Sequence, residues 1–169
     1  MEIQSLEVFL EYYGGIRSRT RRVIDCIPPE YLEWSHHQGK FTFGDLIRHL
    51  AGAERYMFAE NVAGRPSCYS GHGTELAHGH DAVMAYFERL HTEAMAIFRA
   101  LPAERLQERC DTPAGISMRV WKWLRAMVEH EVHHRGQLYL MLGMLDVSTP
   151  PLYGLTSEEV RARSLERDP

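Results

Sequence analysis

The sequence predicts an all-α domain, a four-helix bundle with a short C-terminal helix, on two observations. Apolar residues recur three and four positions apart over four long stretches, which is the period of an amphipathic α-helix. No stretch alternates between apolar and polar residues over a convincing length, as a half-buried strand would. The chain has 169 residues, so we expect a single domain over residues 1–169 that packs its helices as a bundle.

The first two helices have recognisable ends. The apolar pattern predicts a helix over residues 6–26, and Pro28–Pro29 ends it because proline lacks the backbone donor and clashes with the preceding turn. The second helix is predicted over residues 42–63. Thr42 is its N-cap, with Asp45 three positions later in an arrangement close to a capping box.

The second half of the chain continues the pattern. A loop rich in Gly, Ser and His (residues 67–80) precedes the third predicted helix, over residues 81–101. Ser117 is the expected N-cap of the fourth helix, which we expect to end just before Gly143. Thr156 is a plausible cap for the short terminal helix.

The composition argues against several classes of protein. The net charge is −4 with histidine neutral, whereas a nucleic-acid binder carries a basic surface. The longest apolar run falls far short of the roughly 20 residues of a membrane span, and the N-terminus lacks a signal-peptide pattern. The cysteines are odd in number and widely spaced, which implies no disulfide framework and fits a reduced, cytoplasmic protein: Cys26, Cys68 and Cys110.

Histidine is unusually frequent, with ten residues, and two of them suggest a metal site. His130 and His134 lie four positions apart on the fourth predicted helix, so their imidazoles are separated by about 40° and 6 Å and reach one ion. His49 occupies a similar apolar row on the second predicted helix. Unpaired imidazoles are costly to bury, and three of them on two bundle helices form the ligand set of a catalytic-type metal site.

Three other interpretations of these histidines are open. Buried histidines can simply bond to backbone or side-chain acceptors. The stretch His130-Glu131-x-x-His134 also matches the H-E-x-x-H pattern of zinc peptidases, in which Glu131 would be the general base, but the Gly and His of the extended pattern are absent after His134. Finally, His133 adjoins His134 and competes with it as the partner of His130, although the spacing of four favours His134.

Three stretches of the chain resemble the DinB-like superfamily, which includes bacillithiol-transferase and mycothiol-dependent isomerase branches. They are residues 40–50 (KFTFGDLIRHL), residues 130–137 (HEVHHRGQ) and residues 151–156 (PLYGLT). The resemblance covers essentially the whole chain in order, and the H-x-x-x-H-R-G-Q ending is its most specific part.

This resemblance implies a DinB/YfiT-like four-helix bundle in which the histidines that match His49, His130 and His134 hold a divalent metal, commonly zinc or nickel. It also implies frequent homodimers. A metal in such a site activates water or a thiol as a nucleophile. We therefore expect a metal-dependent enzyme with a small-molecule substrate, either a hydrolase or a thiol S-transferase that uses a small thiol such as bacillithiol, mycothiol or glutathione. The alternative is a non-catalytic metal-binding stress-response protein.

Four residues near the histidines have expected roles within that interpretation. Glu131 is expected on the helix flank, with at most a surface or subunit contact. Arg135 is expected to form salt bridges or to lie on a dimer surface, and Gly136 to allow close helix packing. Gln137 falls one turn from His134 and is a candidate to orient its imidazole through a hydrogen bond.

Other polar and aromatic residues are expected to be structural. The basic cluster on the first helix is expected on a solvent-exposed face: Arg17, Arg19, Arg21 and Arg22. The histidines of the Gly-rich loop are expected in solvent: His72, His78 and His80. Two aromatic residues that are candidates for the mouth of the site are more simply core residues: Trp34 and Tyr56.

Overall fold

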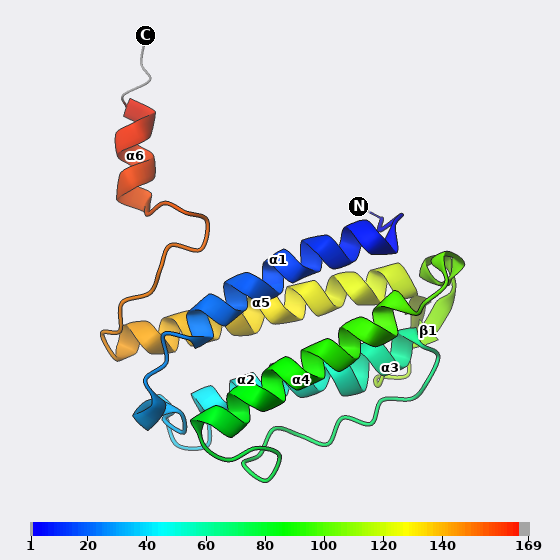
Figure 1. Cartoon of the computed structure of the whole chain (residues 1–169), viewed down its shortest axis with the longest axis horizontal. Coiled ribbons are helices and arrows are strands. Elements are labelled where there is room, and N and C mark those ends of the chain that lie inside the picture. Colours follow the sequence, from blue (N-terminus) through cyan, green and yellow to red (C-terminus); the bar gives the residue numbers. More distant parts are fainter. Residues whose placement is uncertain (1, 166–169) are drawn as a thin grey trace.

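The computed structural model describes residues 2–165 and is built mainly of long helices (Figure 1). The four long helices of the bundle are α1 (Leu6–Ile24), α2 (Phe43–Ala53), α4 (His80–Arg99) and α5 (Val120–Met144). Short 3-10 turns lie in the connections, at η1 (Pro29–Tyr31) and η3 (Ala103–Gln107). In Figure 1, α1 lies beside α5 and α2 lies beside α4. The predicted all-α bundle is confirmed.

The first two helices begin where the sequence predicts. The Ser5 hydroxyl accepts a bond from the backbone N–H of Val8 and caps α1. Thr42 and Asp45 form a complete capping box at the start of α2, which satisfies two backbone donors that the helix itself leaves unpaired. The helical path of α2 then continues through a π-helical turn, η2 (Glu54–Phe58), into α3 (Ala59–Val62).

The predicted start of the fourth helix is wrong, because a short hairpin precedes it. Strands β1 (Arg109–Asp111) and β2 (Ser117–Arg119) pair antiparallel. The turn between them places Gly115 at φ 73°, a left-handed conformation that glycine adopts without strain. Ser117 therefore belongs to a strand, and the first N–H of α5, from Val120, donates to the carbonyl of Glu108. Strands of three residues are too short to show alternation in a sequence.

The C-terminal end of α5 also differs slightly from the prediction. The helix runs two residues past the expected end, to Met144, and Asp146 takes the left-handed position at φ 55° instead of Gly143. The terminal helix α6 (Ser157–Leu165) is confirmed, and Thr156 and Glu159 exchange capping bonds at its start. It has no buried residue and extends away from the bundle (Figure 1). None of the described helices is long and apolar enough to cross a membrane.

A polar layer separates two apolar clusters in the core. On α1, Ile16 belongs to the first cluster and Val23 to the second, and buried Arg17 lies between them. On α5 the clusters hold Met127 and Leu138, and the buried residues between them are polar: Glu131, His134 and Arg135. Buried polar groups require partners, so this layer is where the fold places its chemistry.

Candidate metal centre

The structure brings the three predicted histidines together. His49 projects from α2, and His130 and His134 project from α5. One ring nitrogen of each lies within 4.8 Å of the others. The Nε2 atoms of His49 and His130 are 2.9 Å apart, a distance at which two imidazole nitrogens share a proton or a cation. His133 is exposed and lies outside this group, so the geometry favours His134 as the partner of His130.

Hydrogen bonds to residues outside the cluster orient two of the three imidazoles. The Nδ1 atom of His134 donates to the Oε1 atom of Gln137 at 2.7 Å, which leaves the Nε2 lone pair of His134 for the cluster. The Nδ1 atom of His49 is 2.7 Å from the hydroxyl of Tyr69. The orienting role predicted for Gln137 therefore has its hydrogen bond, and Tyr69 provides a second one that the sequence did not indicate.

The surroundings keep the imidazoles neutral. Burial, followed by the neighbouring histidines, lowers the pKa of His49 from 6.5 to about 3 and that of His130 from 6.5 to about 4. Burial also lowers the pKa of His134, although its bond to Gln137 partly opposes this. Because a metal binds the deprotonated imidazole, all three side chains are in the protonation state that a metal requires at neutral pH.

Aromatic residues and a loop form the wall of the cluster. Phe41 lies against His49 and His134, with ring centroids 5.8 and 6.5 Å away, and Phe58 lies 5.7 Å from His130. The ring of His72 packs 4.4 Å from that of Phe41. The expectation that His72 lies in a solvated loop is wrong.

The loop that carries His72 is fastened to α2 by a buried arginine. Arg48 is fully buried, donates to the carbonyls of His72 and Ala77, and forms a bidentate pair with Glu33. This explains how a Gly-rich loop lies over the site. The helical pattern alone gave no signal for it, because an arginine beside a polar loop is normally expected in solvent. His78 is exposed, as expected.

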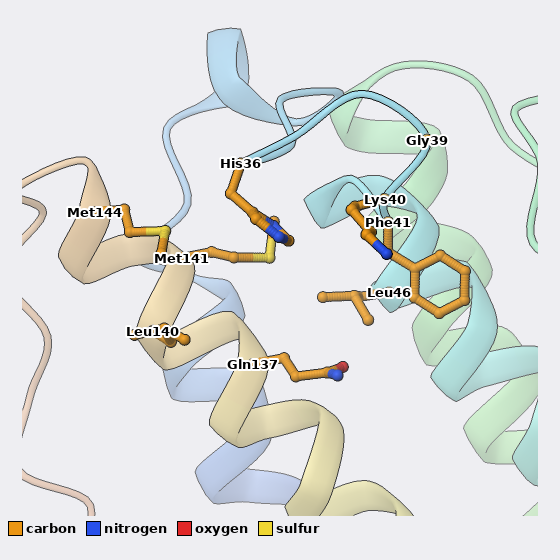
Figure 2. Close-up of a pocket in the computed structure, with 9 residues that line it drawn as sticks. All are labelled: His36, Gly39, Lys40, Phe41, Leu46, Gln137, Leu140, Met141 and Met144. Atoms are coloured by element: carbon orange, nitrogen blue, oxygen red, sulfur yellow. The ribbon is translucent and has the colours of Figure 1, made fainter.

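Trp34 and Tyr56 pack against the second apolar cluster, as expected of core aromatics. A cavity of about 370 Å³ opens between α5 and the loop that follows η1 (Figure 2). Gln137 and Phe41 line it, so the residues that hold and cover His134 also form a wall of the cavity. A small molecule in this cavity would therefore be separated from His134 by the side chains of Gln137 and Phe41.

A second polar group is buried in the same layer and corrects two predictions. Arg17 was expected in solvent but is only 4% exposed, and Glu131 was expected on a helix flank but is only 2% exposed. Arg17 bonds Glu131 at 3.0 Å and lies 3.2 Å from Glu54, and Tyr13 donates to Glu131 at 3.0 Å. Burial would lower the pKa of Arg17, but the carboxylates of Glu131 and Glu54 raise it. Hydrophobic periodicity cannot reveal such pairs, because an arginine and a glutamate each resemble surface residues when taken singly.

Two further expectations about α5 are also wrong. Arg135 is 3% exposed and donates to the carbonyl of Ile16 at 3.2 Å, so it lies inside the bundle, away from any subunit surface. Gly136 faces open space, since a Cβ atom placed there would meet no atom within 4 Å. Close helix packing is therefore not its role.

Comparison with known proteins agrees with this architecture. The model of the DinB superfamily matches residues 13–138, which is well over half of the chain. The chain belongs to the DinB superfamily. The matched range contains all three clustered histidines, and no curated protein sequence matches the chain.

Solved structures of DinB-like proteins share the fold. A DinB-like protein from Bacillus cereus superposes with a TM-score of 0.69 at 19% identity, covering 88% of this chain and 97% of that one. A DinB-like protein from Bacillus subtilis gives 0.68 at 16% identity, covering 85% and 96%. At such low identity the likeness establishes the common fold, while the chemistry has to be argued from the residues themselves.

Proposed function

We propose that this DinB-superfamily protein is a metal-dependent enzyme in which His49, His130 and His134 hold one divalent ion, zinc or nickel. The observation that carries the proposal is the convergence of three neutral imidazoles on one point, with their nitrogens within 4.8 Å. The donor set fits such an ion, because imidazole is a preferred ligand of zinc and nickel and three protein ligands are typical of catalytic sites.

The residues around the cluster support turnover of a small molecule. When bound, the ion would lower the pKa of a water or thiol that reaches it and so supply a nucleophile at neutral pH. Gln137 and Tyr69 orient the imidazoles, and the ring of Phe41 packs near His49 and His134. The cavity lined by Gln137 and Phe41 has a volume of about 370 Å³, within the usual range for small-molecule sites. The reaction class is hydrolysis or S-transfer from a small thiol.

The peptidase alternative is disfavoured by the position of Glu131. Its Oε2 atom accepts bonds from Tyr13 and Arg17. A general base must reach the proton that it removes, and this carboxylate is committed to the buried ion pair. We therefore propose no catalytic role for Glu131.

We also propose that the chain forms a homodimer. The groove between α1 and α5 supports this, because the exposed apolar side chains of Val8 and Tyr12 lie there beside Val128. Exposed apolar residues that gather on one face are typical of subunit contacts. Molar mass from light scattering tests the assembly, and Tyr12→Glu is expected to shift it toward the monomer.

The deciding experiment combines metal analysis with an activity screen. The zinc-loaded and nickel-loaded proteins are incubated with electrophilic substrates in the presence of bacillithiol, mycothiol or glutathione, and with ester and amide substrates in their absence. Turnover that requires both metal and thiol identifies an S-transferase, and turnover without thiol identifies a hydrolase. Stoichiometric metal with no turnover in either arm would favour the non-catalytic stress-response alternative.

Glu131→Gln serves as the control for mechanism. The variant is expected to keep its metal and to retain activity within a few-fold, because the carboxylate does not face the cluster. Full metal occupancy with complete loss of activity would instead reinstate the peptidase-like mechanism, since removing a general base costs on the order of hundred-fold or more in rate.

A further inference from the structure

The cavity between α5 and the loop that follows η1 has two nitrogen-bearing side chains at its rim. His36 and Lys40 extend from the loop toward the space above α5, and the amide of Gln137 extends into the same space from the helix (Figure 2). Lys40 is one of only two lysines in the chain. Within residues 2–165, neither the Lys40 ammonium nor the His36 ring has a hydrogen-bond or ion-pair partner.

The rest of the cavity is apolar. Its walls are formed by side chains from α2, α5 and the loop: Phe41, Leu46, Leu140, Met141 and Met144. Leu140 and Met144 are 63% and 53% exposed, unusually high values for large apolar residues on a helix that is otherwise well packed. Methionine adapts its shape easily, so two methionines suit a surface that receives ligands of variable outline.

We infer that this cavity binds a small amphiphilic anion, with a carboxylate at Lys40 and His36 and an apolar body along α5. An unpaired cation next to an apolar wall favours a ligand that has both features, because the charge gains a partner while the apolar surface leaves water. This inference rests on the proposed function, for which it names the class of substrate. Gln137 connects the cavity with the histidine cluster, since it lines the cavity and also accepts a hydrogen bond from His134.

The probe is octanoate, with octanamide as its uncharged counterpart. Both are titrated into the zinc-loaded protein and into chelator-treated protein, and backbone amide signals are followed by NMR. We expect octanoate to shift the signals of residues 36–41 and 137–144 and to bind more tightly than octanamide. Removing a charged hydrogen-bond partner with Lys40→Met should weaken octanoate about tenfold and leave octanamide unchanged.

Lys122→Met is the matched control, because it removes the only other lysine, which lies on α5 but outside the cavity. It should leave both affinities unchanged. A second variant, Leu140→Glu, places a negative charge at an exposed position of the cavity wall and should weaken octanoate more than octanamide.

The outcomes separate this inference from the metal proposal. Octanoate binding that depends on Lys40 in both forms of the protein supports the anion site, even if no metal is ever found. Binding that disappears with chelator but ignores Lys40→Met would mean that the carboxylate reaches the metal directly, which overturns the assignment of Lys40. Absence of binding, or shifts confined to residues outside 36–41 and 137–144, would overturn the site itself.

Discussion

Two buried polar groups occupy the middle of the bundle, and adjacent residues of α5 belong to them. His130 joins the histidine cluster, and Glu131 joins the ion pair with Arg17. In the ion pair, the guanidinium of Arg17 lies against the carboxylates of Glu131 and Glu54, so opposite charges meet inside the protein. In the histidine cluster, three neutral imidazoles converge, and their contacts with one another pair no opposite charges.

The difference shows which of the two groups has a structural role and which has a functional one. Opposite charges that pair within the chain fix how helices pack, although their net energetic gain is modest because of the cost of burying charge. Imidazole nitrogens that converge on one point offer lone pairs to a ligand such as a metal ion. Mutations in the two groups should therefore have separable effects, on metal binding in one case and on stability in the other.

The largest expected effect is on metal content. The protein purified without chelator should hold about one divalent ion per chain, and His134→Ala or His130→Ala should lose nearly all of it, because two protein ligands remain of three. His133→Ala is the matched control and should keep its metal, since His133 is exposed and outside the cluster. Mass spectrometry of the metal after desalting measures this. Loss of metal from His133→Ala together with retention by His134→Ala would mean that His133, and not His134, is the ligand.

The next effect is on stability and tests the ion pair. Arg17→Met leaves Glu131 buried without a cation, so the free energy of unfolding should fall by about 3–5 kcal/mol. Arg21→Met removes an exposed pair with Glu88 and should cost at most about 1 kcal/mol. Urea denaturation measures both. The folded fraction of Arg17→Met should still bind metal, and a loss of metal without a loss of stability would contradict the division of roles.

A smaller effect is expected from the residues that hold the imidazoles. Gln137→Leu removes the acceptor of the His134 Nδ1–H bond, and loss of such a partner typically weakens metal affinity by about 10–100-fold. Tyr69→Phe removes the corresponding bond to His49 and should act in the same direction. Competition with a chromophoric chelator measures the affinities. If neither variant changes them, these hydrogen bonds do not orient the ligands.

The sequence predicted the histidine cluster well and the ion pair not at all. Histidines at a spacing of four within an apolar row are visible because both the residue type and the helical face can be read directly. Arg17 and Glu131 are on different helices, and only their meeting in space reveals that they are buried. The same reason hid Tyr69, whose loop lies over the site because buried Arg48 fastens it there.

The fold follows a similar division. Caps and apolar periodicity gave the helices, including the capping box at Thr42. The hairpin before α5 was missed because each strand has only three residues. The strands are also defined by hydrogen bonds to each other, which the sequence of either segment does not show. Local signals predict local structure, and contacts between distant segments require the assembled chain.

The smallest effect expected is a pH dependence of the metal-free protein. The pKa of His49 is about 3 and that of His130 about 4 in the folded chain, against an ordinary value of 6.5. Between these values the unfolded chain binds more protons than the folded one, so the free energy of unfolding should fall as the pH decreases below about 6.5. Asp45 and Glu60 have lowered pKa values and contribute at more acidic pH, so the comparison is made above about pH 5.

His130→Ala separates this contribution from the rest. The variant lacks one of the neutral buried imidazoles, so its stability in the presence of chelator should depend less steeply on pH than that of the parent chain. Urea denaturation at several pH values from about 7 to about 5 measures the slopes. Equal slopes for His130→Ala and the parent would mean that the histidine cluster is hydrated and protonates as it would in water, and the contrast between the two buried groups would no longer hold.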